Sequence, residues 1–303
     1  MVIGQITRDL VLTVDQVPGP AGTTAVRQRR EMLGGKGANQ AVGLAQLGVS
    51  VGLLGVVGDD EVGRRVLDQA RSDGIDTSPV VCRPGTETAL VVDIVDRQGQ
   101  WHYLESMPAG TLLTEPDVAA TPALDGASAA LVQLQQPTAA ALAAARRAHA
   151  AGARVLLDGA PEEARQRDAL LAVADIVRAD AREAEKLTGA SVTDPASAVR
   201  VGRDLLGRGP SMVALAVGTR GNAFIWRDGQ ALIPLVDTPV ADTTGAGDAL
   251  IAGLVAALLR GEEPRQAARF AVAAAAATVG HPGGRPNLSA DGIDEQLAKV
   301  HES

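Results

Sequence analysis

Short apolar runs alternate with helical patterns along most of the chain, and this alternation constrains the fold more than any other feature. The first half has strand-like runs at 2–6 and 51–57, each followed by a helical pattern, at 37–47 and 60–73. The alternation resumes with strands at 129–134, 154–158, 176–179 and 212–217 and helices at 138–151, 162–172, 181–187 and 195–206. Such a pattern is typical of a mostly parallel sheet covered by helices. We therefore expect one large α/β domain over residues 1–303.

Residues 80–105 depart from this alternation. Two β-like runs, 88–95 and 100–104, surround a turn at 96–99, and no helical pattern separates them. A hairpin inserted into an α/β chain often belongs to a separate small sheet, and residues 10–33, which also lack a clear helix, are candidates for its other strands. We expect a small β-sheet lid formed by about 10–33 and 80–105.

The composition excludes several classes of protein. A net charge of −8 argues against a general nucleic-acid binder, which needs concentrated positive charge. Cys82 is the only cysteine and the four histidines are scattered, so no structural zinc site is expected. The alanine-rich runs at 139–151 and 271–277 are shorter than the roughly 20 apolar residues that span a bilayer. We expect a cytoplasmic protein without a nucleic-acid or membrane partner.

The segment Thr-Gly-Ala-Gly-Asp at 244–248 opens a very apolar helix at 249–259. Its glycines let the backbone approach a ligand closely, and the free N–H groups at a helix start attract anions. Asp248, in the first turn, is placed to accept a proton from an incoming hydroxyl, as phosphoryl transfer requires. The alternative is a glycine-rich helix start whose aspartate favours the helix dipole. Spacing alone leaves both open.

A second motif, Gly-Gly-Lys-Gly-Ala-Asn-Gln at 34–40, also opens a helix. Gly35 and Gly37 permit tight packing on a ligand, while Lys36 and Asn39 can donate hydrogen bonds to hydroxyls. A glycine turn with a solvated lysine is the alternative. The chain has three lysines against 25 arginines, so lysine is not its usual surface cation, which favours the functional interpretation.

These two motifs, in this order and separation, resemble those of the ribokinase-like family of carbohydrate and nucleoside kinases. Three lesser matches support the resemblance, which covers nearly the whole chain: Gly4-x4-Asp9, Glu183 to Gly189, and Gly218 to Gly221. The resemblance implies a three-layer α/β/α domain with a mostly parallel central sheet. It also implies an ATP-dependent kinase that phosphorylates a hydroxymethyl group of ribose or a related pentose or polyol.

The resemblance assigns a role to each matching position. Asp248 would take the proton, and the backbone N–H groups of Gly245, Ala246 and Gly247 would hold the phosphoryl group. The substrate would contact Thr7, Asp9, Gly35, Lys36, Gly37, Asn39, Gln135 and Asp248. ATP would contact Asp180, Gly218, Thr219, Arg220, Gly221 and Gly247.

Metal ions and a partner subunit are also implied by the resemblance. Glu183 would help to place Mg²⁺ through water. A monovalent cation, K⁺, would lie near the phosphoryl site, held by Asp242, Thr244, Thr278, His281, Gly283 and Asn287. The lid would join two copies of the chain into a homodimer.

Three positions depart from the family pattern. Thr7 and Gln135 stand where ribokinases usually have Asn and Glu, and Asp180 replaces the Asn of a magnesium motif. The first two put ribose itself in doubt, so a nucleoside kinase and a non-catalytic sugar- or nucleotide-binding protein stay open. Trp101 and Tyr103 share one face of a strand and would stack on a base or sugar ring, or pack within the lid or a dimer.

Overall fold

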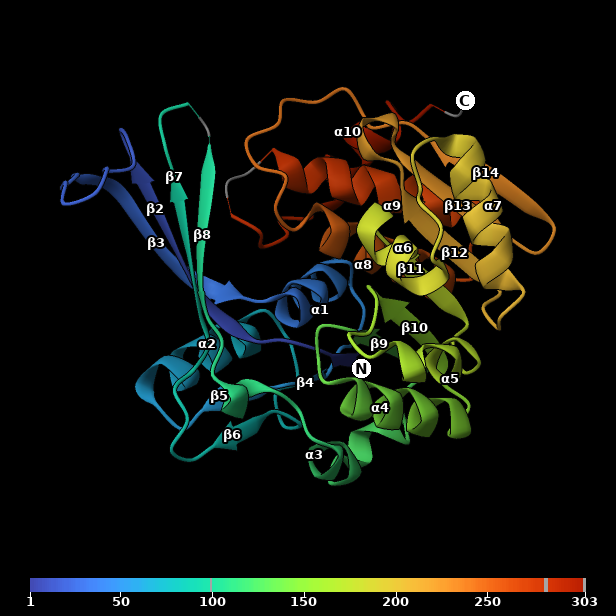
Figure 1. Cartoon of the computed structure of the whole chain (residues 1–303), viewed down its shortest axis with the longest axis horizontal. Helices are drawn as coiled ribbons and strands as arrows, with labels where there is room; N and C mark the ends of the chain where they lie inside the picture. Colours follow the sequence, from blue (N-terminus) through green and yellow to red (C-terminus); the bar gives the residue numbers. More distant parts are fainter. Residues whose placement is uncertain (99, 281–282, 302–303) are drawn as a thin grey trace.

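The main sheet runs through the body of the molecule (Figure 1). It has eight strands within the described residues. The computed structural model describes residues 1–98, 100–280 and 283–301. The strand order is β14-β13-β12-β11-β10-β9-β1-β4, parallel from β4 through β12 and antiparallel at β13 and β14. Their bounds are β1 Val2–Ile3, β4 Leu53–Leu54, β9 Ala129–Gln133, β10 Arg154–Asp158, β11 Ile176–Ala179, β12 Met212–Ala216, β13 Asn222–Trp226 and β14 Gly229–Ile233.

Helices cover both faces of this sheet, which explains the near-continuous apolar runs of its strands. In β10, Leu156 packs into one core while Val155 and Leu157 pack into the other, because successive side chains point to opposite faces. The first core includes α1 Lys36–Gln46, α2 Glu61–Ser72, α8 Ala246–Leu259, α9 Pro264–Val279 and α10 Ala290–Leu297. The second includes α3 Glu115–Ala119, α4 Thr138–Ala150, α5 Arg167–Leu171, α6 Ala181–Thr188 and α7 Pro195–Leu206. The predicted three-layer α/β/α class is confirmed.

A separate four-stranded sheet, hereafter the small sheet, projects from the body beside α1 and α2 (Figure 1). Its order is β3-β2-β7-β8, and only β2 and β7 are parallel to each other. Its strands are β2 Thr7–Val14, β3 Val26–Gly34, β7 Leu90–Val95 and β8 Trp101–Ser106. The strands come from the two segments expected to supply them, although β2 begins at Thr7 rather than near 10. One residue of the predicted 96–99 turn, Gly99, lies outside the described residues.

Several predicted elements differ in extent, and the strand predicted at 2–6 ends at Ile3 as β1. The run at 51–57 divides at Gly55, where a Cβ would lie 2.6 Å from the Gly4 carbonyl oxygen. After this point β5, Val56–Gly58, pairs with β6, Val81–Arg83, instead of continuing the main sheet. The helix predicted at 162–172 shortens to a 3₁₀ turn and α5, so that Glu162 remains in a loop. Within the described part of the chain, no helix combines the length and apolar character that crossing a membrane requires.

Candidate active site

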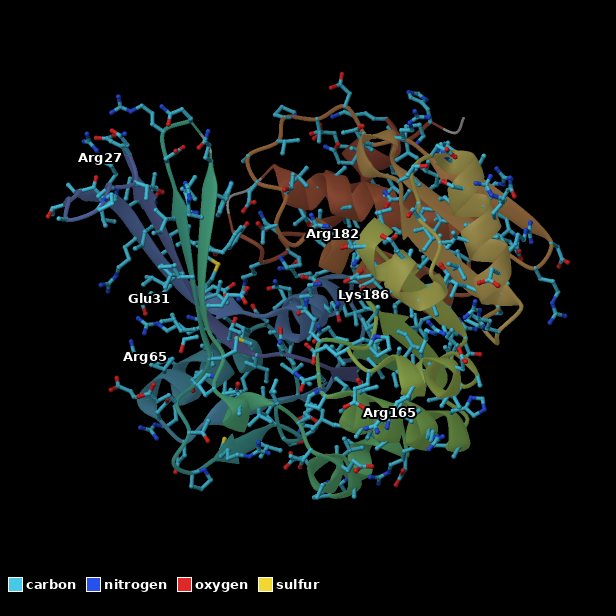
Figure 2. All side chains as sticks on the ribbon, viewed as in Figure 1. Arg27, Glu31, Arg65, Arg165, Arg182 and Lys186 are labelled. Atoms are coloured by element: carbon cyan, nitrogen blue, oxygen red, sulfur yellow. The ribbon has the colours of Figure 1, made fainter. Side chains whose placement is uncertain are left out.

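A cavity of about 540 Å³ lies where the carboxyl ends of the parallel strands meet the small sheet. Ligands of open α/β sheets bind at this edge, because the loops that follow the strands converge there. The segments after β1 and β9, the starts of α1 and α8, and three strands of the small sheet all contribute side chains. Ten predicted site residues line the cavity: Thr7, Asp9, Gly35, Lys36, Asn39, Gln135, Glu183, Thr244, Gly245 and Asp248. Lys186 of α6 is a further lining residue (Figure 2).

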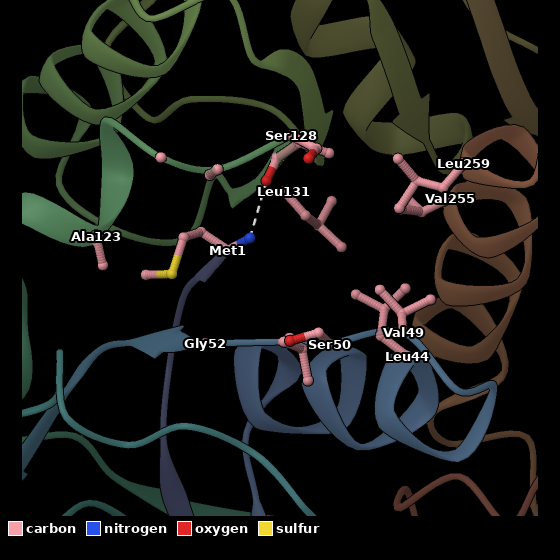
Figure 3. A pocket seen from close by; sticks show the side chains of 14 residues that line it. Met1, Leu44, Val49, Ser50, Gly52, Ala123, Ser128, Leu131, Val255 and Leu259 are labelled. Carbon is pink, nitrogen blue, oxygen red and sulfur yellow. Dashed lines mark hydrogen bonds between the residues drawn. The ribbon is translucent and has the colours of Figure 1, made fainter.

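A second cavity, of about 550 Å³, lies at the opposite, amino ends of the strands (Figure 3). There the Met1 nitrogen donates to the Ala129 carbonyl at 2.8 Å. The side chains around it, such as Leu44, Val255 and Leu259, are small or apolar, and none of the lining residues carries an ionisable side chain. The Met1 amino group is the ionisable group at this cavity, and its lining has no carboxylate, lysine or arginine to bind phosphates or orient a hydroxyl.

Glycines at the start of α8 create room for neighbouring groups. Gly245 has φ 75°, and a Cβ there would lie 1.9 Å from the Gly284 carbonyl oxygen. At Gly247 a Cβ would come within 2.4 Å of the Arg178 guanidinium. A side chain at either position would displace the loop or the arginine, so both glycines are required by the close packing around the first turn of α8. Ala246 and Gly247 are not themselves among the residues that line it.

Asp248 is held by two amides from the Gly-Gly-Lys-Gly-Ala-Asn-Gln helix. The Gln40 side-chain nitrogen donates to Asp248 Oδ1 at 3.1 Å and to Asp158 Oδ2 at 2.7 Å. The Asn39 amide donates to Asp248 Oδ2 at 3.4 Å. The Asp248 side chain thus bonds across to α1, and no side-chain cap bond is present at the start of α8. This arrangement disfavours the alternative of a simple capping aspartate.

The environment of Asp248 raises its pKa from 3.8 to about 7. Burial is the largest cause, and the negative charge of Asp158 adds to it, while Lys36, Arg178 and the Gln40 hydrogen bond act in the opposite direction. Desolvation disfavours the charged form of a carboxyl group. A general base works best when its pKa is near the working pH, so this environment suits proton abstraction near neutrality.

Sequence reasoning missed three side chains that support Asp248: Gln40, Asp158 and Arg178. Arg178 Nη1 donates to the fully buried Asp158 at 3.0 Å and lies 3.9 Å from Glu183. Asp158 ends β10, and a carboxylate at the carboxyl end of a parallel strand is a signal that would have drawn attention to it. Gln40 stood within a recognised motif, but Arg178 had no local signal.

Thr7 and Asp9 form the part of the cavity nearest β2. The Thr7 hydroxyl donates to Asp9 Oδ1 at 2.5 Å, so the threonine orients the aspartate as well as lining the cavity. A Cβ on Gly34 would lie 1.9 Å from the Asp9 carboxyl group, which explains a glycine there. Burial raises the pKa of Asp9 to about 6, opposed by the Thr7 bond and reinforced by Glu105.

The start of α1 is shaped by close backbone packing. Gly37 does not line the cavity: a Cβ there would lie 2.7 Å from the Gly4 Cα, so this glycine lets the helix pack on β1. Lys36 does line it, and its Nζ lies 3.8 Å from Glu183 Oε1. The lysine is therefore not a solvated side chain on a plain turn.

Asp180 and Glu183 form a capping box at the start of α6. Asp180 accepts from the Glu183 N–H, and Glu183 accepts from the Asp180 N–H, each at 2.8 Å. Asp and Asn are about equally good N-caps, so the departure from Asn leaves the cap of α6 intact. Glu183 keeps its other oxygen toward Lys36.

The predicted nucleotide residues lie farther along the same sheet edge. Gly218, Thr219 and Arg220 form an exposed 3₁₀ turn directly after β12, and they do not line the cavity. Gly221 has φ 109°, and a Cβ there would lie 2.1 Å from the Ile233 carbonyl oxygen. Its glycine is required by the packing of this turn on β14.

The predicted cation segments lie together. The buried Asp242 accepts from the N–H groups of Thr244 and Gly283, each at 2.8 Å, which joins the loop before α8 to the segment after α9. The Thr278 hydroxyl donates to a carbonyl of its own helix, Ala274, at 3.1 Å. Asn287 follows in the described chain, whereas His281 lies outside the described residues.

Tyr103 joins the small sheet to the loop before α8. Its hydroxyl lies 2.8 Å from the Thr244 hydroxyl, and its ring stacks on Trp101 with centroids 6.2 Å apart. Tyr103 lines the cavity, whereas Trp101 does not. The pair therefore packs within the small sheet, with one ring available to a ligand.

Known proteins and solved structures resemble the chain over most of its length. The chain is 32% identical over 289 residues to a ribokinase of Haemophilus influenzae, covering 95% of this chain and 94% of that protein. It is 31% identical over 297 residues to an ATP-dependent ribose-1-phosphate kinase of Halopiger xanaduensis, covering 98% and 97%. The fold is similar to those of ribokinases from Thermotoga maritima (TM-score 0.83, 24% identity, 98% of each chain) and from Arabidopsis thaliana in complex with ribose and ATP (0.82, 23%, 98% and 97%).

The match to a family model extends over residues 1–291, and its description is pfkB family carbohydrate kinase. The expected resemblance is thereby confirmed: the chain belongs to the pfkB family of carbohydrate kinases.

Proposed function

We propose that the protein transfers the γ-phosphoryl group of ATP to a hydroxymethyl group of a small sugar, ribose or a related pentose or polyol. The observation that carries this proposal is Asp248, a buried carboxylate on the first turn of α8. It lines the cavity and has a pKa raised to about 7. The named functions of the relatives, ribokinase and ribose-1-phosphate kinase, support the substrate class.

In the proposed reaction, the sugar hydroxyl oxygen bonds to the γ-phosphorus of ATP, and Asp248 accepts the proton that this hydroxyl loses. The bond between that phosphorus and the oxygen of ADP breaks, and ADP leaves. The N–H groups of Gly245, Ala246 and Gly247, at the positive end of α8, would hold the transferring group. Thr7, Asp9, Gly35, Lys36, Asn39 and Gln135 would contact the sugar, and all of them line the cavity.

ATP would lie along the sheet edge between this cavity and the turn formed by Gly218 to Gly221. Asp180 would accept a bond from the nucleotide, and Glu183 would hold Mg²⁺ through water. Oxygen ligands suit Mg²⁺, and the Glu183 oxygen that faces Lys36 is directed at the cavity. When bound, Mg²⁺ neutralises charge on the phosphates. Because ATP is made and used in the cytoplasm, we place the reaction there.

We also propose activation by K⁺ next to the start of α8. The buried Asp242 supplies negative charge where two loops meet, and Thr244, Thr278, Gly283 and Asn287 would add oxygen ligands. Turnover in KCl is expected to exceed turnover in tetramethylammonium chloride of equal ionic strength, and Asp242→Asn should remove the difference. Equal rates in the two salts would contradict the proposal.

A homodimer through the small sheet is a further proposal. The face turned away from the cavity carries an apolar stripe in which Leu104 is 61% exposed and Leu12, Val92 and Ile94 are half-buried. A second copy of the same face would cover the stripe. We expect a dimer by light scattering and a monomer for Leu104→Glu. Leu235→Glu, at a residue 55% exposed on the main body, is the control and should stay dimeric.

A nucleoside kinase is the second candidate, favoured by Tyr103, whose ring lines the cavity and is 49% exposed. A base would stack on this ring in place of solvent. A panel of pentoses, polyols and nucleosides with ATP and Mg²⁺ separates the two candidates through the rate of ADP release. Preference for nucleosides over free sugars would establish the second.

The test of catalysis is Asp248→Asn, which keeps the size of the side chain and removes the base. We expect kcat to fall by about 10²–10⁴-fold, the usual contribution of a general base, with KM little changed. Asp228→Asn, in the exposed turn before β14, is the matched control. An unchanged kcat in Asp248→Asn would overturn the assignment. Ligand-induced thermal shifts without ADP release from any substrate would instead favour a non-catalytic binding protein.

A further inference from the structure

Asp93 of β7 is a buried carboxylate that the proposed reaction does not use. Its side chain is 2% exposed and lines the cavity. Oδ1 of Asp93 has no hydrogen-bond partner among the described residues. A buried acceptor without a donor costs free energy, and more so when it is charged, so the position calls for a donor from outside the protein.

The register of the small sheet places two more carboxylates beside Asp93. Asp9 pairs with Val91, and Val91 pairs with Glu105, so these side chains project from the same face as Asp93, two residues along β7. All three carboxylates line the cavity, whereas no lysine or arginine of the described small sheet does. Lys36, on the opposite wall, faces Glu183. The small-sheet side of the cavity is therefore lined by three acidic groups that have no cationic partner among the described residues of that sheet.

We propose that the substrate carries a protonated amine at the end that contacts Asp9 and Asp93, which makes it an amino-substituted sugar or polyol. The proposal rests on the phosphotransfer function above and specifies its substrate class. An ammonium group has three N–H donors and a full positive charge, enough to reach the unpartnered Asp93 oxygen and Asp9 together. Anionic substituents would be rejected, because they would face three carboxylates.

The titration behaviour of these groups agrees with the geometry. Burial, followed by the charges of Asp9, Asp242 and Glu105, raises the pKa of Asp93 to about 7. All of the causes that act on Asp93 are burial or neighbouring negative charges, and no positive charge is among them. A neutral pentose would supply hydroxyl donors to Asp9 but no positive charge to balance Asp93 when that group ionises.

The experiment compares matched substrates that keep the C5 hydroxymethyl group. These are D-ribose, its analogues with an amino group replacing the hydroxyl at C1, C2 or C3, and ribose 1-phosphate as the anionic probe. We expect kcat/KM by ADP release at pH 7 to be at least about tenfold higher for one amine than for ribose, the difference between a charge-assisted and a neutral hydrogen bond. Ribose 1-phosphate should be the poorest substrate.

Asp93→Asn tests the residue, because it removes the charge and keeps the shape. The ratio of kcat/KM for the amine to kcat/KM for ribose should fall about tenfold, because the KM of the amine rises. The kcat/KM for ribose should change by less than about threefold. Asp228→Asn should leave the ratio unchanged. If Asp93→Asn does not fold, as judged by circular dichroism, Glu105→Gln replaces it and should lower the ratio in the same direction.

Two outcomes overturn the inference: ribose equals or exceeds every amine, or the variant lowers kcat/KM of both substrates by one common factor. In either case ribose is turned over, so the kinase function stands. If no sugar of the panel releases ADP, the proposed function itself fails, and the inference fails with it.

Discussion

The two walls of the cavity differ in whether their charged side chains are paired. On the wall made by the main sheet, Arg178 pairs with Asp158, Gln40 bridges Asp158 and Asp248, and Lys36 faces Glu183. On the wall made by the small sheet, Asp9 has one neutral hydroxyl partner, and Asp93 has an oxygen with none among the described residues.

This contrast divides the work between the two sheets. Groups that act on every turnover gain from fixed neighbours whose charges are already paired, because preorganised dipoles need no rearrangement during the reaction. Groups that select the substrate need hydrogen-bonding atoms that have no partner within the protein and can bond to the substrate. The main sheet would therefore carry the chemistry, and the small sheet would carry the specificity. The following substitutions test that division, from the largest expected effect to the smallest.

Arg178→Met should destabilise the paired wall most. It leaves the buried Asp158 without its cation, and breaking a buried pair costs about 3–5 kcal/mol. Urea denaturation measures the loss of unfolding free energy. Arg65→Met removes an exposed i,i+4 pair with Glu61 on α2 and should cost about 0.3–0.5 kcal/mol (Figure 2). Similar losses in the two variants would contradict the claim that the inner network is special.

Gly245→Ala should have the next largest effect, a loss of turnover. The new Cβ would overlap the Gly284 carbonyl and shift the first turn of α8, where the phosphoryl group is proposed to bind. We expect kcat to fall by about 10²–10³-fold, as for loss of an oxyanion donor. Gly261→Ala is the control, since it has a similar φ of 82° and open space around its Cβ. A kcat loss shared by both variants would trace the effect to general backbone strain.

Asp93→Asn should stabilise the protein at alkaline pH. The pKa of Asp93 is raised to about 7 when folded, so the native state binds its proton more tightly than the unfolded state does. This contribution to stability is complete below about pH 4 and is lost as pH rises toward 7. A shift of this size corresponds to roughly 4 kcal/mol, and solvent screening at the mouth of the cavity reduces it. The variant should therefore gain on the order of 2 kcal/mol over wild type at pH 8, and about nothing at pH 4.

Urea denaturation of wild type and Asp93→Asn at several pH values measures this difference. Asp9, Glu105, Asp242 and Tyr103 all interact electrostatically with Asp93, and the pKa of Asp9 is raised to about 6. Asp228→Asn is therefore needed as a control for the change in net charge. A gain that is the same at pH 4 and pH 8 would show that the charge of Asp93 is not its cause.

Tyr103→Phe should have the smallest effect, on the contact between the walls. It removes the bond to Thr244, worth about 0.5–1.5 kcal/mol and less at a half-exposed site. KM for the sugar should rise by no more than about tenfold, with kcat nearly unchanged. A large loss of kcat would mean that Tyr103 participates in the chemistry, contrary to the proposed division.

Elements whose sequence pattern is local could be predicted from the sequence, whereas those that depend on contacts between distant residues could not. Strands such as β9, β10 and β11 are buried on both faces, so their apolar runs are visible locally. The short α3 was not predicted, because five residues carry too little periodicity. The run at 51–57 was predicted as one strand, and its division depended on how closely Gly55 approaches Gly4, a contact between distant residues.

In the candidate site too, residues in local motifs could be predicted, whereas bonds between distant residues could not. Asp248, Lys36 and Asn39 were predicted because glycine-rich helix starts have a local signature. Gln40 and Asp158 are 118 positions apart, and no local pattern reveals that they are bonded. The position of Asp93 beside Asp9 depends on the parallel register of β2 with β7, which the sequence does not display.

The sequence by itself determined the α/β architecture, the two helix starts and the identity of the carboxylate proposed as the base. These features depend on periodicity and on backbone conformations that only glycine adopts easily, and both are local properties. The tertiary structure alone decided which charges are paired. Arg178 reaches Asp158 across neighbouring strands, whereas Asp93 lies among other carboxylates, because electrostatic neighbours are set by long-range packing.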